Sequence, residues 1–117
     1  MIRSAGEDAV ATQPGVDKVL VGLSDPTRRT VLLVLARTGG ATASELADLL
    51  PVSRQAIGKH IATLIDAGLV TRTKHGREVV FRPDKQPLID AGHWLIDLAE
   101  SWDDRLAALK RVAESGG

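Results

Sequence analysis

The fold of this chain is decided by residues 41–82, which read ATASELADLLPVSRQAIGKHIATLIDAGLVTRTKHGREVVFR. Thr42 and Glu45 have the spacing of a capping box, in which each residue satisfies a free backbone amide of the other at the start of a helix. The apolar stripe that follows is made of leucines: Leu46, Leu49 and Leu50. The sequence therefore predicts a short first helix that begins just after Thr42 and ends before Pro51.

A second helix is predicted from Ser53, which is a good N-cap residue, to about Ala67, where Gly68 suits the left-handed position past a helix end. Apolar residues spaced for one face of this helix are Ile57, Ile61, Leu64 and Ile65. The opposite face is small, polar and positive, and it carries Gln55, Lys59, Ala62 and Thr63. The turn Leu50-Pro51-Val52 joins the two helices, so the pattern is that of a helix-turn-helix.

A short basic hairpin follows the second helix. Residues 69–73 and 78–82 read as two paired strands with residues 74–77 between them. Gly76 supplies the positive backbone dihedral angle that a tight hairpin needs. The basic residues on the hairpin and its shoulders are Arg72, Lys74, Arg77 and Arg82. The hairpin is therefore interpreted as a wing attached to the helix-turn-helix.

The outward face of the second helix suits the major groove of DNA, which admits a helix and displays a distinct donor and acceptor pattern for each base pair. Gln55 can pair with adenine through two hydrogen bonds, and Lys59 can donate to guanine or to a phosphate. Ser53 and Arg54 lie at the helix start, where backbone amides and the helix dipole favour a phosphate oxygen. We expect the first pair to read bases and the second pair to position the protein.

The wing is expected to lie against the sugar-phosphate backbone or in a minor groove. His60 lies at the edge of the apolar face of the second helix, where packing and a backbone or phosphate hydrogen bond are expected, and His75 lies at the hairpin tip. The complete set of predicted DNA-binding residues is Ser53, Arg54, Gln55, Lys59, His60, Thr63, Arg72, Lys74, His75 and Arg77.

The distribution of charge agrees with this interpretation, although the chain as a whole is neutral with 15 basic and 15 acidic residues. Residues 51–82 hold six basic and two acidic side chains, whereas residues 83–117 hold four basic and seven acidic ones. Nucleic-acid binding depends on clustering of positive charge on one face rather than on the total. A solvated surface with scattered signs is the alternative.

A long last helix is predicted from Gln86 to about Ala113, with apolar residues at intervals of seven. Such a seam favours a partner helix, and a small domain has little core with which to cover it, so we predict a homodimer. The predicted dimer interface is Leu88, Leu95, Leu98, Trp102, Leu106 and Leu109. Trp94 is interpreted as a further interface anchor. The alternatives are a seam packed within one chain and a small-molecule pocket between subunits.

The remaining segments build the scaffold. Asp25-Pro26 opens a helix that ends at Gly39-Gly40, and a shorter helix is predicted over about 16–23. The core face of the helix opened by Asp25 is predicted to be Val31, Leu32, Leu35 and Ala36. We therefore expect a mainly α protein with about five helices and a two-stranded wing. Its parts are a flexible tail over residues 1–15, a winged helix-turn-helix domain over 16–113 and a flexible end over 114–117.

Leu50–Val70, followed by His75-Gly76-Arg77-Glu78, closely resembles the recognition region of ArsR-type winged-helix bacterial repressors. Leu23–Arg29 is similar to the opening of the second helix of that family, and the resemblance extends over roughly residues 16–112. The resemblance implies a homodimeric transcription factor that sits on a pseudo-palindromic double-stranded operator, usually as a repressor.

Two features of this chain depart from the family pattern, and a third resembles one subgroup of the family. The arsenic- and cadmium-sensing members carry a cysteine motif in the third helix, whereas this chain has no cysteine, which excludes thiolate-based metal or redox sensing. Gly58 stands where the family more often has Ser or Thr, either to permit close approach of a helix or of DNA or through simple tolerance. The segment around Trp94 and Trp102 resembles a subgroup without a metal motif.

The sequence favours neither an enzyme nor a cofactor-dependent protein. It contains no P-loop, no zinc-protease histidine pair and no nucleophile with a convincing base. One row of the last helix carries Asp90, His93, Asp97 and Glu100, which is read as the wet side of the helix, with a divalent metal site as the alternative. We predict no metal and no cofactor, and the sequence names no effector ligand.

Two further expectations concern location and a rival function. No segment has the apolar length of a signal peptide core or a membrane span, so we expect a cytoplasmic protein. The rival function is a winged-helix protein-interaction module that does not bind DNA. Such a module would place apolar or acidic residues on the outward helix face, where this chain has Gln55 and Lys59.

Overall fold

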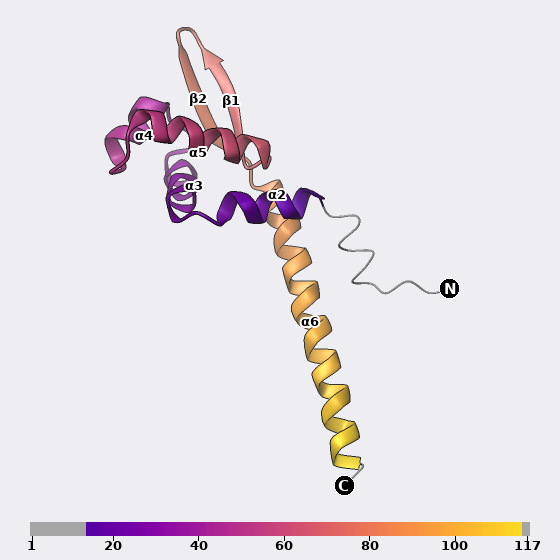
Figure 1. The fold of residues 1–117 in the computed structure, drawn as a ribbon. Coiled ribbons are helices and arrows are strands. Elements are labelled where there is room, and N and C mark those ends of the chain that lie inside the picture. Colours follow the sequence, from indigo (N-terminus) through magenta and orange to yellow (C-terminus); the bar gives the residue numbers. More distant parts are fainter. Residues whose placement is uncertain (1–13, 116–117) are drawn as a thin grey trace.

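The computed structural model of the protein describes residues 14–115 and contains helices α2 to α6 and a two-stranded sheet (Figure 1). In chain order the elements are α2 (Pro14–Leu23), α3 (Pro26–Thr38), α4 (Ala43–Leu49), α5 (Arg54–Asp66), β1 (Val70–His75), β2 (Glu78–Pro83) and α6 (Gln86–Ser115). These elements confirm the predicted fold class, a mainly α winged helix-turn-helix.

The element boundaries differ from the predicted ones by about two residues at each end of the domain. Helix α2 already includes Pro14 and Gly15, and α6 continues through Glu114 and Ser115. Residues 1–13 and 116–117 of the two predicted flexible ends lie outside the described residues.

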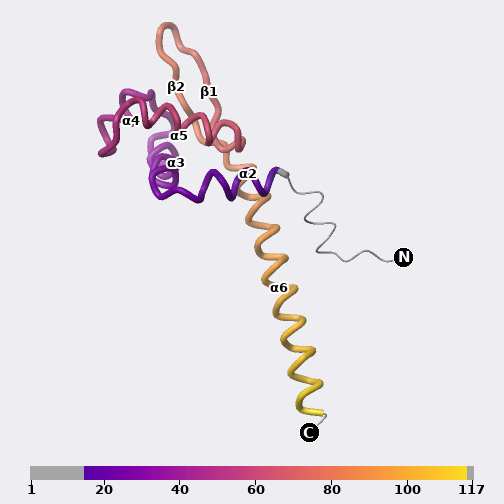
Figure 2. Tube along the Cα trace, in the orientation of Figure 1, coloured from indigo at the N-terminus to yellow at the C-terminus, as the bar shows by residue number. Residues whose placement is uncertain are grey.

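Helices α2 to α5 and the wing form a head, from which α6 projects (Figure 2). Helices α2 to α5 and the wing pack together, and α6 leaves this head after contact with α2 along its first turns. Ala91 is the buried residue of α6, and from Leu95 onward every residue of α6 in the described chain is exposed. No helix within residues 14–115 carries an apolar stretch long enough to cross a membrane.

Two helices begin where their capping residues predict. The backbone amide of Thr42 donates to Glu45 Oε1 at 2.9 Å, and the amide of Glu45 donates to Thr42 Oγ1 at 3.1 Å, which is the predicted capping box. Ser53 Oγ accepts from the amide of Ala56 at 3.1 Å and caps α5. The amide hydrogen bond from Thr42 holds the pKa of Glu45 below its ordinary value, because it stabilises the ionised carboxylate.

The core lies between α2, α3, α5 and the base of the wing. Its largest fully buried side chains are Leu35, Leu46, Ile57, Leu64, Leu69, Val19 and Val31. Three residues predicted to face the core are instead exposed, namely Leu49, Ile65 and Ala36. Successive residues of a helix are rotated by about 100° around its axis. Each of the three exposed residues therefore lies roughly 60–140° from the first buried residue of its stripe, which is at or beyond the edge of the apolar face.

The contrast between Leu46 and Leu49 gives a direct test of this packing. Leu46 is 0% exposed and Leu49 is 61% exposed, although both lie on the two-turn helix α4. We expect Leu46→Ala to lower the free energy of unfolding by about 2–5 kcal/mol, because it leaves a cavity. Leu49→Ala, the matched control on the same helix, changes it by less than about 0.5 kcal/mol. Urea unfolding followed by circular dichroism measures both, and equal losses would contradict the assigned core.

The wing is longer, and its turn tighter, than predicted. The predicted four-residue connection over residues 74–77 is wrong, because β1 and β2 pair from Val70↔Pro83 to His75↔Glu78 and leave a two-residue turn, Gly76-Arg77. Gly76 has a φ of 62°, which confirms the predicted positive dihedral angle at the tip. With Gly at the first central position the turn matches the hairpin geometry that suits twisted strands.

The base of the wing is fastened to the helix-turn-helix by backbone hydrogen bonds. The amide of Ala41 donates to the carbonyl of Phe81 at 3.0 Å, and the amide of Phe81 donates to the carbonyl of Ala41 at 2.8 Å. Since Ala41 immediately precedes the capping box of α4, this pair fixes β2 beside the start of α4. The wing therefore has a defined orientation relative to the two helices.

Candidate nucleic-acid interface

The outward face of α5 consists of the polar residues that the sequence assigned to it. Ile57, Ile61 and Leu64 are buried, so Gln55 and Lys59 on the other side are exposed. Within residues 14–115 neither of these two side chains makes a hydrogen bond or an ion pair. Their donors and acceptors are therefore free to meet a ligand along the length of the helix.

Two predicted residues at the edges of this face are already engaged. Ser53 is exposed, but its hydroxyl oxygen caps α5 through Ala56. Thr63 is half-buried, and its hydroxyl donates back to the carbonyl of Lys59 at 3.3 Å. Arg54 is exposed on the first turn of α5, beside the capping serine. The arrangement leaves Arg54, Gln55 and Lys59 as the accessible row.

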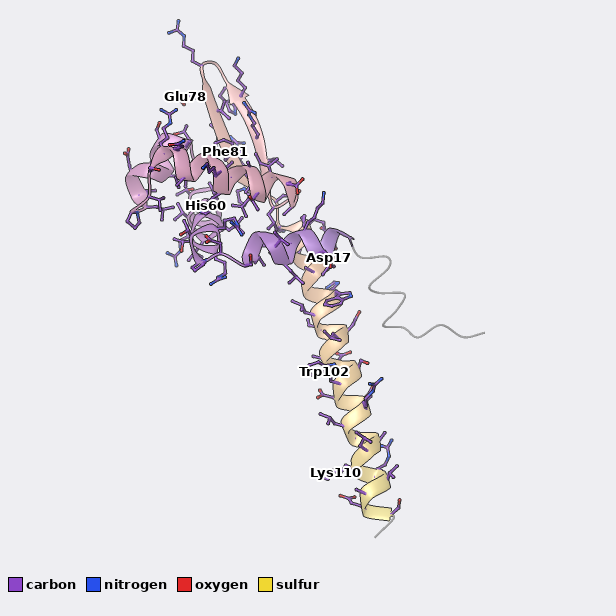
Figure 3. All side chains as sticks on the ribbon, viewed as in Figure 1. Asp17, His60, Glu78, Phe81, Trp102 and Lys110 are labelled. Atoms are coloured by element: carbon purple, nitrogen blue, oxygen red, sulfur yellow. The ribbon has the colours of Figure 1, made fainter. Side chains whose placement is uncertain are left out.

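His60 lies on α5 next to α3 (Figure 3), and it is half-buried, unlike the residues of this row. Its Nδ1 is 3.4 Å from Arg28 Nη1 and 3.9 Å from Asp25 Oδ2, and its side chain is 22% exposed. Both neighbours belong to the start of α3. The structure confirms the predicted packing of His60, whose polar partners are side chains of the same molecule. Its contact with DNA stays a prediction.

Arg28 is a structural residue that sequence reasoning missed. Its guanidinium donates to the carbonyl of Gly22 at 2.8 Å and to the carbonyl of Val21 at 2.9 Å, both at the end of α2. It also contacts His60 on α5, so one side chain joins three helices. Its own amide donates to Asp25 Oδ2 at 3.0 Å and thereby holds the pKa of Asp25 below its ordinary value. The motif Asp25–Arg28, interpreted only as a helix start, was the available signal.

The two faces of the wing carry different residues, and the strand register identifies them. Arg72 lies opposite Phe81 and Lys74 lies opposite Val79, and directly opposed residues share a face of a two-stranded sheet. Phe81 packs against the core, so this face is turned toward the helix-turn-helix. His75 lies on the other face, where its Nε2 is 3.5 Å from Arg82 Nη2.

Comparison with known proteins identifies the family. A model described as a helix-turn-helix domain matches residues 23–73. An ArsR-like transcriptional regulator from a Rhodococcus species is 43% identical, covers 91% of this chain and 96% of its own, and has a TM-score of 0.85. The arsenic resistance transcriptional regulator of Pseudomonas putida is 32% identical over 110 residues, which is 92% of this chain and 82% of that protein. The chain belongs to the ArsR family of winged helix-turn-helix regulators.

The family assignment settles the class of protein. The transcriptional repressor SdpR of Bacillus subtilis is also similar, with 26% identity over 91 residues that make up 78% of this chain and all of that protein. These relatives are transcriptional regulators and not enzymes, as the sequence predicted. This member of the ArsR family has no cysteine, so it lacks the thiolate ligands of the cysteine-bearing sensors.

The structure also bears on the metal alternative. In the part of the chain from Pro14 to Ser115, no group of three or more His, Asp or Glu side chains is placed to hold a metal ion. Asp90, His93, Asp97 and Glu100 are all exposed along α6. Within one chain this row has the character of a solvated helix face.

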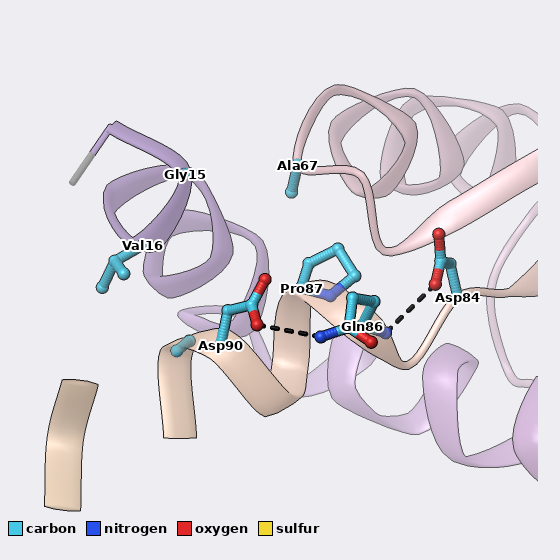
Figure 4. Close-up of a pocket in the computed structure, with 8 residues that line it drawn as sticks. Gly15, Val16, Ala67, Asp84, Gln86, Pro87 and Asp90 are labelled. Carbon is cyan, nitrogen blue, oxygen red and sulfur yellow. Dashed lines mark hydrogen bonds between the residues drawn. The ribbon is translucent and has the colours of Figure 1, made fainter. Parts of the chain in front are cut away.

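A cavity of about 410 Å³ lies where α6 leaves the head, between the start of α2, the end of α5 and the first turns of α6 (Figure 4). Two hydrogen bonds link polar groups of its lining. Asp84 Oδ1 accepts from the amide of Gln86 at 3.0 Å, and Gln86 Nε2 donates to Asp90 Oδ1 at 2.9 Å. Both hydrogen bonds lie at the start of α6 and stabilise its first turns.

The predicted dimer residues all lie on the exposed surface of α6 in the single chain: Leu88, Leu95, Leu98, Trp102, Leu106 and Leu109. Trp102, at 65%, is among the most exposed. Trp94 differs from them, since it is half-buried and packs against the core of its own chain. The structure thus gives Trp94 a role in fixing α6 to the head, and its role as an interface anchor stays a prediction.

Gly58 lies in an open position on α5. A Cβ built on it meets no described atom within 4 Å outside the backbone of its own helix, so the suggestion that this glycine admits a neighbouring helix of the same chain is wrong. Close approach of DNA and simple tolerance remain as the two explanations.

Replacement of this glycine separates those explanations. We expect Gly58→Ala to raise the free energy of unfolding by about 0.5–1 kcal/mol, because alanine loses less backbone entropy in a helix. We also expect it to weaken binding to duplex DNA, since the added methyl group lies on the exposed side of α5 beside Lys59. Thermal unfolding and fluorescence anisotropy measure the two effects. Unchanged affinity in a stabilised variant would favour simple tolerance.

Proposed function

We propose that this ArsR-family regulator is a homodimeric repressor that recognises a pseudo-palindromic operator in double-stranded DNA. The observation that carries the proposal is the exposed row Arg54, Gln55 and Lys59 on a helix whose other side is locked into the core. The similarity to the repressor SdpR supports repression. The wing adds Arg72, Lys74, His75 and Arg77, all exposed, as proposed contacts beside that helix.

In this proposal α5 enters the major groove with its first turns, and the wing meets the DNA backbone or the minor groove. Gln55 and Lys59 read base edges, because they stand on the outward side of the helix with unused hydrogen-bonding groups. Ser53 and Arg54 position the helix on a phosphate. Thr63, at the edge of the face, contributes a smaller contact.

Substitution of the reading residues and of the wing gives different expected results. Gln55→Ala and Lys59→Ala reduce discrimination among operator variants, with about 1–3 kcal/mol less preference for the correct base at one position. Arg77→Ala weakens all duplexes to a similar degree and lowers the slope of log affinity against log salt by about one. Anisotropy titrations on an operator selected in vitro, and on its single-base variants, measure both. Unchanged relative affinities for Gln55→Ala would contradict its reading role.

The rival function is a protein-interaction module, and salt distinguishes it from DNA binding. Neutralised phosphates make affinity fall steeply with rising salt. A mixed-sequence duplex that fails to bind even at low salt would favour the interaction module. The exposed face of α5 argues for DNA, because it holds basic and amide side chains where the interaction module would place apolar or acidic ones.

The apolar row on α6 supports the homodimer. Beyond Trp94 no residue of α6 is covered by the described part of the chain, yet the leucines and Trp102 continue at heptad spacing to Leu109. An unpaired row of this kind is covered most simply by the same row of a second copy about a twofold axis. Two copies would present two α5 helices to successive major grooves about 34–36 Å apart.

A charge placed in this row tests the assembly. We expect Leu106→Glu to convert the protein to a monomer, because a buried unpaired carboxylate is strongly unfavourable in an apolar interface. The matched control is Ala107→Glu, which adds the same carboxylate at the next residue of α6. Ala107 is exposed and lies outside the apolar row. Sedimentation velocity gives the mass in solution, and circular dichroism checks that both variants fold. A wild-type protein that sediments as a monomer at micromolar concentration would overturn the proposed dimer.

A further inference from the structure

A groove of about 390 Å³ separates the wing from the start of the helix-turn-helix. It is lined by side chains from α4, α5, the turn of the wing and both strands, and three of them are arginines: Arg54, Arg72 and Arg77. Glu78 is the carboxylate among the lining residues, and Ser44 contributes a hydroxyl group. Three guanidinium groups against one carboxylate give the groove a larger excess of positive charge than the other two cavities within residues 14–115 that are compared with it.

The convergence of these arginines follows from the fold. Arg72 shares a face of the wing with Phe81, whose backbone pairs with Ala41 beside α4. That face is therefore turned toward the start of α5, where Arg54 is the first helical residue. Arg77 is the second residue of the turn that closes the wing over the same groove. Residues separated by up to 23 positions in the sequence are thus brought to one opening.

We infer that Arg54, Arg72 and Arg77 form one seat for a single phosphate of the DNA backbone, held between the recognition helix and the wing. This inference rests on the proposed DNA binding and specifies how the backbone is held. A guanidinium group donates two parallel hydrogen bonds to phosphate oxygens, and a phosphate group has enough oxygens for more than one such partner. Ser44 adds a neutral donor at the rim, and Glu78 limits the excess charge.

The seat has an energetic consequence that separate contacts do not have. Three like charges around one groove repel one another in the free protein, and the negative charge of a phosphate offsets part of that repulsion when it binds. The arginines then act as a unit that also clamps the wing against α5. Loss of one arginine disturbs the same bound group as loss of another, so their effects on DNA affinity are not independent.

A double-mutant cycle tests this coupling. Arg54→Ala and Arg72→Ala each weaken operator binding, and the double variant is expected to bind about threefold or more tighter than the product of the two single losses implies. The matched control is Arg82→Ala, an exposed arginine on the opposite face of the wing, whose loss multiplies with that of Arg54→Ala. Affinity is measured by anisotropy at one salt concentration, with circular dichroism to confirm folding.

Duplexes that carry one uncharged methylphosphonate in place of a phosphate locate the seat. We expect that methylphosphonate substitution at one backbone position per half-site weakens binding of the wild type. The same substitution is expected to lower the affinity of Arg54→Ala or of Arg72→Ala only a little further. Single losses that multiply, or that map to different phosphates, would overturn the shared seat while DNA binding stands. A wild-type protein that binds no duplex would overturn both the seat and the proposed function.

Discussion

The burial of Ile57, Ile61 and Leu64 is the interaction on which the rest of the molecule depends. Each of these side chains contributes about 1.5–3 kcal/mol by leaving water, so the rotation of α5 about its axis is strongly fixed. A turn of one residue position, about 100°, would expose the apolar stripe and bury Gln55 or Lys59 without a partner. The outward face of the recognition helix is therefore a consequence of core packing, and it is set before any DNA is bound.

A second constraint decides where the positive charge gathers. The Ala41–Phe81 backbone pair fastens the wing at its base, and the alternation of side chains along β1 then directs Arg72 to the helix-turn-helix and His75 away from it. A shift of register by one residue would exchange the two faces. The charged groove thus depends on two backbone hydrogen bonds that involve none of the arginines themselves.

Much of this architecture could be predicted from the sequence because its signals are local. The capping residues Thr42 and Ser53 and the turn glycine Gly76 each act within a few residues, and the structure confirms all three. The contacts of Arg28 could not be predicted in the same way, because they join positions up to 32 residues apart that only packing brings together. The exposure of Leu49 was missed for a related reason: a two-turn helix offers too few residues for periodicity to define its buried side.

The contacts of Arg28 connect the element proposed for dimerisation with the element proposed for DNA recognition. Helix α2 packs on α6, which carries the proposed dimer row, and the final carbonyls of α2 accept hydrogen bonds from the guanidinium that also meets His60 on α5. In the proposed dimer, a change in the relation between the two copies would reach the recognition helix through these hydrogen bonds as well as through apolar packing. Any effector of this protein must discriminate between two such arrangements in order to alter DNA affinity. It must do so without a thiolate, since the chain has no cysteine.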